Sequence, residues 1–139
     1  MEFLDVKYPQ TQFLEKFLST AGKSLETFRY FSKRPLNAIE KHLCTYLLKE
    51  GKEVLAYGHL DKEEETVWLG IAVAEYATGK GLGKMMMHQL LDFAKKNHVP
   101  EIKLSVDNDN LTAINLYVSM GFSLLEKKEK FSFYTLKNL

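Results

Sequence analysis

Three glycines at alternate positions, Gly79, Gly81 and Gly83, have the spacing in this sequence that most clearly indicates a chemical role. Glycine lets successive backbone N–H groups converge on an anion, and the first turn of a helix adds unsatisfied N–H donors with a partial positive charge. Lys80 and Lys84 lie in the same segment and supply formal charge. The segment is therefore predicted to hold a phosphate group.

The spacing excludes two common nucleotide-binding motifs. A P-loop requires Ser or Thr directly after its Lys, whereas Met85 follows Lys84. The dinucleotide fingerprint places two residues between its second and third glycines, and only Leu82 separates Gly81 from Gly83. What remains is a Gly-x-Gly turn of a size that suits a diphosphate.

A strand is predicted before this turn and a helix after it. Residues 66–73 alternate apolar and other residues with period two, which is typical of a strand. From residue 82 to about residue 97, apolar residues recur at helical spacing. The end of the strand is expected to splay from its neighbour beside the glycine-rich turn.

Length and composition restrict the classes of protein that remain. A chain of 139 residues suits one domain, residues 1–139, and the net charge of +1 argues against nucleic-acid and membrane-surface partners. No apolar run is long enough for a membrane span, and the first residues do not resemble a signal peptide. One cysteine, Cys44, excludes an internal disulfide, and no residue cluster has metal-ligand spacing. We expect a soluble, cytoplasmic domain without a metal.

The remaining pattern predicts an alternation of strands and helices along the chain. Strands are expected at residues 2–8, 42–48, 54–60, 102–106, 122–125 and 131–136. A helix is expected from Pro9 to Gly22 and a short one at residues 35–39. A last helix is expected through about Met120, and residues 107–110 offer several possible N-caps for it. The final strand, Phe131–Leu136, is expected at a sheet edge, where it would be free to pair in a homodimer.

Two motifs resemble the signatures of the GNAT superfamily of acetyl-CoA-dependent N-acetyltransferases. The first is Thr78-Gly-Lys-Gly-Leu-Gly83, and the more specific second one is Asn110-Leu-Thr-Ala-Ile-Asn-Leu-Tyr-Val-Ser-Met-Gly-Phe122. The resemblance covers roughly residues 53–125. It implies an α/β (α+β) fold with a mixed, mostly antiparallel sheet of about six to seven strands and helices on both faces.

The resemblance also implies which residues bind acetyl-CoA. The main chain at the end of the central strand would bind the pantetheine arm, and the glycine-rich turn would surround the pyrophosphate. Asn110 and Ala113 would contact the coenzyme, with Tyr117 beside its sulfur. Thr78 replaces the Gln or Arg that is usual in the family. The residues of the strand and the turn are Ile71, Ala72, Val73, Thr78, Gly79, Lys80, Gly81, Leu82, Gly83 and Lys84.

The implied chemistry is attack of an amine on a thioester. The oxyanion that forms needs preorganised N–H donors, for which the backbone at residues 71–73 is the candidate. Tyr117 is the candidate general acid for the leaving thiolate, because a phenol has a pKa near ~10 and a thiol one near ~8.5. Asn110 and Tyr117 are seven residues apart and thus share a helix face. The alternative is that Tyr117 is a core residue with a satisfied hydroxyl.

The general base is predicted less directly. His59 is the first candidate, since its strand should adjoin the central one, although a structural or exposed histidine is the alternative. Asp61 or Glu75 acting through water are further options. Some members of the family that this chain resembles acetylate protein amino termini and carry a glutamate where this chain has Ser105, which weakens the hypothesis of a protein-amine acceptor.

The acceptor is predicted from the aromatic and cationic segment 27–34. In one interpretation its aromatic residues fill the core and its charges are solvated; in the other it forms an acceptor-binding loop for an anionic substrate. Arg29, Tyr30, Lys33 and Arg34 favour a small anionic metabolite, such as an amino sugar, as the acceptor. Direct transfer in a ternary complex is expected, because Cys44 lies in an apolar run without a neighbouring base. The alternatives are a protein or peptide amine and a catalytically silent acyl-CoA-binding module.

Overall fold

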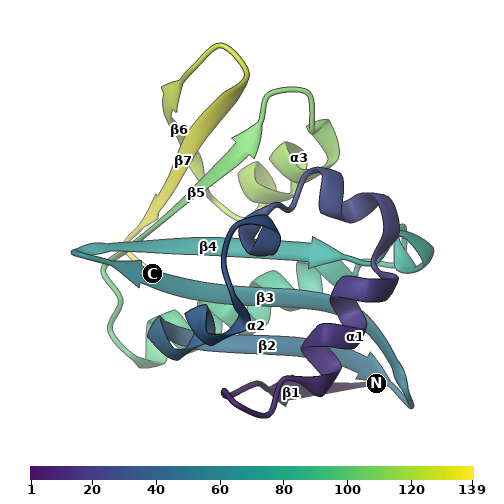
Figure 1. Cartoon of the computed structure of the whole chain (residues 1–139). Helices are drawn as coiled ribbons and strands as arrows, with labels where there is room; N and C mark the ends of the chain where they lie inside the picture. Colours follow the sequence, from purple (N-terminus) through teal and green to yellow (C-terminus); the bar gives the residue numbers. More distant parts are fainter.

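Seven strands form one sheet in the order β1-β2-β3-β4-β5-β7-β6 (Figure 1). The computed structural model describes all residues from Met1 to Leu139. All neighbouring strands are antiparallel except β4 and β5, which are parallel. The predicted fold class is therefore confirmed. The strands are β1 (Glu2–Asp5), β2 (His42–Glu50), β3 (Glu53–Glu63), β4 (Thr66–Val73), β5 (Glu101–Asp107), β6 (Ser123–Lys127) and β7 (Phe131–Lys137).

Three α-helices and four 3-10 helices connect and cover the strands. The α-helices are α1 (Gln12–Thr20), α2 (Leu82–Lys96) and α3 (Leu111–Ser119). The 3-10 helices are η1 (Gly22–Glu26), η2 (Tyr30–Ser32), η3 (Leu36–Lys41) and η4 (Glu75–Ala77). None of these helices combines the length and the apolar character that a bilayer span requires.

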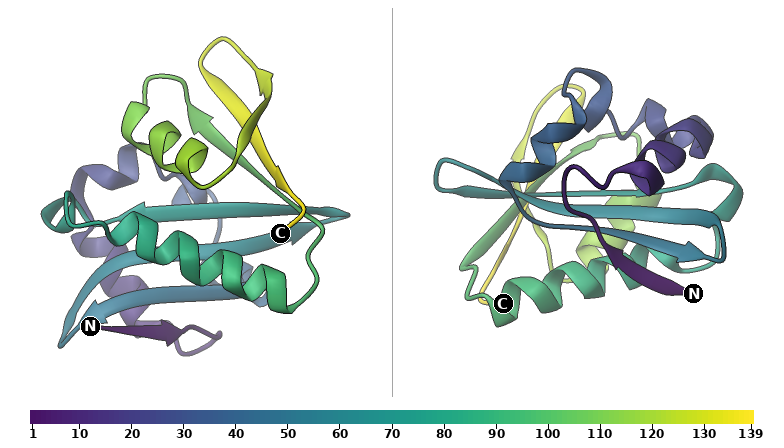
Figure 2. Two further views of the ribbon diagram at one scale, coloured as in Figure 1. Left: turned by 180° about the vertical axis from the view of Figure 1, so that it is seen from behind. Right: turned by 60° about the horizontal axis from the view of Figure 1, so that its bottom comes forward.

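Helices cover both faces of the sheet, as the two views of Figure 2 show. On one face, Phe17 of α1 stacks on Tyr57 of β3, with ring centroids 6.1 Å apart. On the other face α2 crosses so close to β3 that a Cβ at Gly58 would lie 2.6 Å from the Met86 side chain. Since neighbouring strand residues point to opposite faces, β3 is buried on both sides from Val54 to Asp61.

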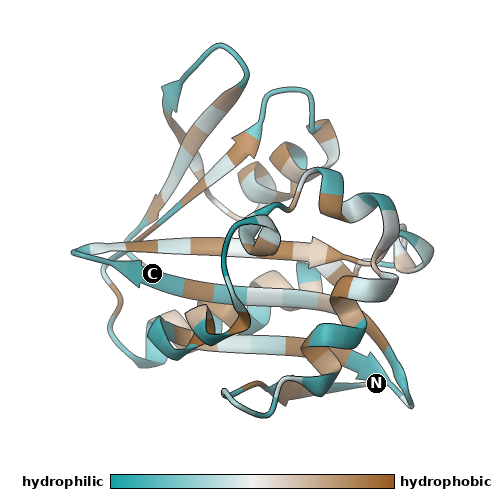
Figure 3. Ribbon diagram, viewed as in Figure 1, coloured by the Kyte–Doolittle hydropathy of each residue, from teal (hydrophilic) through white to brown (hydrophobic).

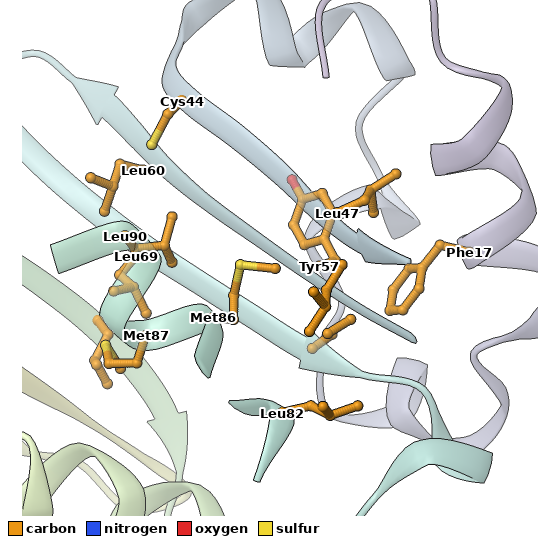
Figure 4. Close-up of a cluster of buried hydrophobic side chains, with 14 of the residues drawn as sticks. Phe17, Cys44, Leu47, Tyr57, Leu60, Leu69, Leu82, Met86, Met87 and Leu90 are labelled. Carbon is orange, nitrogen blue, oxygen red and sulfur yellow. The ribbon is translucent and has the colours of Figure 1, made fainter. Parts of the chain in front are cut away.

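Buried apolar side chains lie on both faces of the sheet, and the apolar colour of Figure 3 is spread over the strands and the helices that cover them. Between α2 and β3, Leu60, Met86 and Leu90 are fully buried (Figure 4). Cys44 lies in the same cluster, and burial raises the pKa of its thiol to about 12. A thiol with that pKa remains protonated near neutrality, so Cys44 fills the core rather than serving as a nucleophile.

The one parallel pair, β4 and β5, separates over most of its length. Their register has a single position, Trp68 opposite Lys103, whereas β4 pairs with β3 from Thr66 to Val73. Figure 1 shows the two strands diverging toward the carboxyl end of β4, with α3 beside the opening. The predicted splay at the end of the central strand is therefore present.

Two local predictions need correction. Pro9 does not lie in the first turn of a helix, because α1 begins at Gln12 and residues 8–9 form a turn before it. The last strand, β7, is not at an edge, since it lies between β5 and β6; the edge strands are β1 and β6. The surface available for a homodimer through strand pairing is thus not the one expected.

Candidate active site

The glycine-rich turn between β4 and α2 owes its shape to two glycines in the left-handed region. Gly79 has φ 81° and Gly81 has φ 77°, and a Cβ at either position would meet no atom within 4 Å. These positions therefore require glycine for backbone conformation rather than for space. Gly83 differs, because a Cβ there would lie 3.2 Å from the Leu116 side chain of α3. It lets the start of α2 approach α3 closely.

The amino terminus of α2 is open to an anion. Its N-cap residue, Gly81, has no side chain that could accept a hydrogen bond from the first turn. The first intrahelical bond runs from the Met85 N–H to the Gly81 carbonyl at 3.2 Å, so the N–H groups of residues 82–84 have no backbone acceptor. Unsatisfied donors at the positive end of a helix suit a phosphate or diphosphate.

A cavity of about 340 Å³ lies against this turn and the end of β4. It brings together the predicted coenzyme residues of both motifs, with the exception of Lys80, which is exposed and does not line it. Thr78 does line it, although its hydroxyl donates to the Glu75 carbonyl at 3.0 Å. The predicted residues in the lining are Ile71, Ala72, Val73, Thr78, Gly79, Gly81, Leu82, Gly83, Lys84, Asn110, Ala113 and Tyr117.

The end of β4 presents backbone groups to this cavity. The Ala74 N–H bonds to the Leu55 carbonyl of β3 at 2.8 Å. Because bonding groups alternate in an antiparallel ladder, the N–H groups of Ile71 and Val73 then point away from β3, into the opening toward β5. The Ser24 hydroxyl of η1 donates to the Val73 carbonyl on that side. The splay therefore leaves main-chain donors facing the cavity.

Asn110 and Tyr117 of α3 complete the wall. The Asn110 side chain caps α3 by accepting from the Ala113 N–H at 3.3 Å, which leaves its amide N–H₂ free to donate. Tyr117 is 8% exposed, and burial raises the pKa of its phenol to about 12. Its hydroxyl has no protein partner, and since no fully buried polar atom lacks one, the hydroxyl reaches the cavity. The alternative of a core tyrosine with a satisfied hydroxyl is not what the structure shows.

A second cavity, of about 470 Å³, joins the first at the splay. Six residues of the first cavity's wall also line it: Thr27, Phe28, Ile71, Asn110, Ala113 and Tyr117. It extends from there along β4 to Trp68 and along β3 from His59 to Glu63. The site thus consists of a phosphate-binding cavity and a polar cavity that meet at the free amides of β4 and the hydroxyl of Tyr117.

Comparison with known proteins decides the family. Residues 10–122 match the Acetyltransferase (GNAT) family. The chain belongs to this family.

Individual GNAT relatives match parts of the chain. Mycothiol acetyltransferase of Renibacterium salmoninarum is 35% identical over 68 residues, 49% of this chain and 20% of that protein. N-alpha-acetyltransferase 30 of Saccharomyces cerevisiae is 33% identical over 64 residues, 46% of this chain and 35% of that protein. The matches thus span about a third or less of these relatives' own length.

Solved structures agree with the fold over nearly the whole chain. A Bacillus subtilis acetyltransferase in complex with CoA has a TM-score of 0.77 at 18% identity, with 99% of each chain covered. A ribosomal-protein-alanine N-acetyltransferase from Brucella melitensis also has a TM-score of 0.77, at 13% identity, covering 99% of this chain and 100% of that one.

The charges in the second cavity of this GNAT protein are mostly paired. Arg29 holds both oxygens of Asp107, at 2.9 and 3.2 Å, across the opening between β4 and β5. Arg34 lies 3.7 Å from Glu63 and stacks over the Tyr30 ring at 4.2 Å. The predicted acceptor residues Arg29, Tyr30 and Arg34 are therefore brought together, but their two cations already have carboxylate partners. Lys33, the fourth predicted acceptor residue, is exposed and does not line the cavity.

His59 opens on this cavity from a buried position. It is 2% exposed, and burial, with a smaller contribution from His42, holds its pKa well below the usual value. The Tyr57 hydroxyl lies 2.6 Å from Nδ1 and has no other partner, so it donates to Nδ1 and the ring carries its proton on Nε2. A ring in this tautomer donates a hydrogen bond from Nε2. The predicted general-base role would require the other tautomer, which leaves the buried Tyr57 hydroxyl without an acceptor.

Asp61 ends a chain of hydrogen bonds that begins inside β2. Tyr30 donates to Asp61 Oδ2 at 2.9 Å, so His42 Nε2–H donates to the Tyr30 oxygen at 2.7 Å. Thr45 then donates to His42 Nδ1 at 2.8 Å. Burial lowers the pKa of His42 to about 4, in agreement with the neutral ring that this chain requires. Burial and the bond to Asp61 together hold the pKa of Tyr30 well above its usual value.

Glu75, the other base considered from the sequence, has a structural position. Its Oε1 accepts from the Lys23 N–H at 2.9 Å, and its own N–H donates to the Ala21 carbonyl at 2.8 Å. Gly22, with φ 71°, allows this contact, since a Cβ there would lie 2.5 Å from Oε1. Glu75 thus connects η1 to η4 through these hydrogen bonds, and it lines neither cavity.

Three site residues were not identified from the sequence. Ser24 fixes the Val73 carbonyl, Asp107 holds Arg29, and Phe28 lies on both cavities while packing 5.2 Å from the Tyr57 ring. Phe28 combines the two interpretations of segment 27–34, because it is both part of the core and part of the site. The aromatic composition of that segment could have identified Phe28 as a site residue, whereas no sequence feature marks Ser24 or Asp107.

Proposed function

We propose that this protein is an N-acetyltransferase that moves acetyl from acetyl-CoA to a primary amine of a small acceptor, directly within a ternary complex. The observation that carries the proposal is the junction of the two cavities at the splayed end of β4. The residues of the first cavity fit coenzyme A, because the open α2 terminus and the left-handed glycines form a diphosphate cradle. The second cavity provides a separate entrance for the acceptor.

The side chains and amides at the junction have distinct roles. Acetyl-CoA, when bound, supplies the activated acetyl group as a thioester. The N–H groups of Ile71 and Val73 would donate to its carbonyl oxygen, where negative charge develops, and one such donor is worth a few kcal/mol. The Tyr117 hydroxyl would give its proton to the leaving sulfur, and the proton that the attacking amine loses would pass to solvent through the acceptor cavity. Because the pKa of Tyr117 is about 12, its hydroxyl stays protonated throughout the pH range in which enzymes work.

The ion pairs in the acceptor cavity indicate the charge of the acceptor. An anionic acceptor was expected because of Arg29 and Arg34, but Asp107 and Glu63 neutralise them. The lining holds two arginines and the three carboxylates Asp61, Glu63 and Asp107, so its formal charge is about −1. We therefore propose a neutral or cationic amine as the acceptor in place of the anion.

The proposal is tested by following release of free thiol from acetyl-CoA in the presence of amines grouped by charge. We expect turnover with small aliphatic amines and slower turnover with amino sugar phosphates. Tyr117→Phe should lower kcat by about a hundredfold or more, the typical contribution of a general acid, with the affinity for CoA unchanged. Calorimetry with CoA measures that affinity separately.

Two outcomes would favour the alternatives. Thiol release with peptides that have free amino termini, and none with small amines, would indicate a peptide acetyltransferase. Binding of CoA with no thiol release for any amine or peptide would indicate a silent acyl-CoA-binding module. A folded protein that gives no heat with CoA or acetyl-CoA would contradict all three interpretations.

A further inference from the structure

Asp61 is the one carboxylate in the wall of the acceptor cavity that takes part in no ion pair. Of the three carboxylates that line this cavity, Glu63 is paired with Arg34 and Asp107 with Arg29. Asp61 is 4% exposed, and its only hydrogen bond in the protein is the one that Oδ2 accepts from Tyr30. Oδ1 has no protein partner, yet no polar atom is both fully buried and unsatisfied, so Oδ1 is accessible from the acceptor cavity or from the hollow that adjoins it, both of which Asp61 lines.

The groups around Asp61 supply no positive charge that is free to pair with it. His42 is neutral, because its Nε2–H donates to Tyr30 and its Nδ1 accepts from Thr45. Arg34 stacks on the outer face of Tyr30 and is paired with Glu63. A buried carboxylate without a cationic partner is unfavourable, and a cation that enters the cavity would remove that penalty. An ammonium group is the cation that the acceptor itself can provide.

The register of the sheet sets the distance between this carboxylate and the reacting amine. Asp61 lies opposite Trp68 on β4, and the donor amide of Ile71 is three residues further along that strand. At the rise of a strand this separation is roughly 10 Å, of which the acetyl group to be transferred occupies about 3 Å. The cavity between these points is lined by Phe28 and Trp68, which suit a methylene chain.

We propose that the acceptor is an aliphatic diamine, with one amine at Ile71 and Tyr117 and the second, as an ammonium ion, on Asp61 Oδ1. This proposal rests on the proposed acetyltransferase function and names the substrate class of the same site. An extended chain of about four to six methylene groups has the required length. The wall beyond Asp61 continues into a further hollow of about 700 Å³ between η3 and the β3–β4 turn, so a longer polyamine also has room.

Three probes of similar length but different distal charge test the proposal: cadaverine, pentylamine and δ-aminovalerate. With the wild-type protein, kcat/KM for cadaverine should exceed that for pentylamine by about ten- to a hundredfold, the range for a hydrogen bond to a charged group. δ-Aminovalerate, whose distal carboxylate would face Asp61, should be the poorest. Equal kcat/KM for cadaverine and pentylamine, or a preference for δ-aminovalerate, would overturn the proposal.

Substitutions assign the preference to Asp61. Asp61→Asn should bring kcat/KM for cadaverine down to that for pentylamine. Glu65→Gln is the matched control, because it removes one negative charge from the adjacent exposed turn without altering the cavity wall. Asp61→Glu keeps the charge but extends the side chain, so the optimum should move toward the shorter putrescine. Equal loss in Asp61→Asn and Glu65→Gln would reduce the effect to general electrostatics and overturn the assignment.

A binding measurement separates this proposal from the proposed reaction. Cadaverine should raise the Tm of the CoA-saturated wild-type protein more than pentylamine does, and Asp61→Asn should abolish the difference. If that shift occurs without thiol release, the acetyl transfer is wrong and the diamine site stands. If thiol is released from all three amines at equal rates and no selective shift occurs, the reaction stands and the diamine site is wrong.

Discussion

Two buried neutral histidines make the stability of this protein depend on pH between about 4 and 7. His42 and His59 each hold their proton on Nε2 and accept a hydrogen bond at Nδ1, from Thr45 and Tyr57 respectively. Burial lowers the pKa of both. In the unfolded chain, both regain a pKa near ~6.5. Below that pH the unfolded state binds more protons than the folded state, so acid favours unfolding.

The magnitude can be worked from His42, whose pKa falls to about 4. The full linkage between ~6.5 and that value is about 3 kcal/mol, and partial exposure of His42 reduces it to about 2 kcal/mol. This stability is complete above pH ~6.5 and is lost as the pH falls toward about 4. His59 contributes in the same direction. Each histidine adds at most about 1.4 kcal/mol per pH unit to the slope.

The assay is urea unfolding at a series of pH values, with the free energy of unfolding taken from each curve. The double variant His42→Gln, His59→Gln cannot titrate at these positions, and its slope should be smaller between about pH 6.5 and pH 4.5. Carboxylates that titrate near the acid end are common to both proteins and cancel in the comparison. Equal slopes in the two proteins would refute the assignment of two neutral buried imidazoles.

Three further predictions concern single residues of the site. Gly81→Ala forces a Cβ into the left-handed region at a cost of about 1–2 kcal/mol, so the Tm and the CoA affinity measured by calorimetry should both fall; an unchanged affinity would show that the turn tolerates another conformation. Glu75→Ala leaves the Lys23 N–H without its acceptor and should lower stability by about 1 kcal/mol in urea unfolding, whereas a large loss of kcat in a stable variant would favour a catalytic role. His59→Gln retains a side-chain donor toward the cavity and should keep kcat within about tenfold of the wild-type value; a loss of a hundredfold or more would restore the general-base hypothesis.

The coenzyme half of the site was predictable because its signals are local. The strand 66–73 was bounded correctly, since its period-two pattern runs without a break between a polar turn and the residues before Gly79. The three glycines predicted the turn, and the helical period of the apolar residues after it predicted α2. Residue types alone limited the N-cap of α3 to a few candidate residues, and Asn110, which caps the helix, was one of them. Each of these features depends on residues within one or two turns of chain.

The acceptor half depends on pairs that are distant in sequence. Arg29 and Asp107 are 78 residues apart, so nothing near Arg29 indicates that its charge is neutralised. The same holds for Tyr30 and Asp61, which are 31 residues apart. The prediction that β7 lies at a sheet edge was wrong for a related reason. The alternation of apolar and polar residues identifies the two strands of a terminal hairpin, but it does not show which of them pairs with β5. The charge of one segment therefore does not predict the net charge of a cavity when the carboxylates that pair with its arginines come from other strands.

The splay of β4 from β5 accounts for both halves of the site at once. Full pairing would engage the amides of Ile71 and Val73 in a ladder and would close the passage between the two cavities. On the open side, the Val73 carbonyl is instead satisfied by the Ser24 hydroxyl, while the amides keep no strand partner. At Val73 the acceptor is thus satisfied and the donor is left free. The free donors give this edge a preference for developing negative charge, and none of the residues that line both cavities has a cationic side chain.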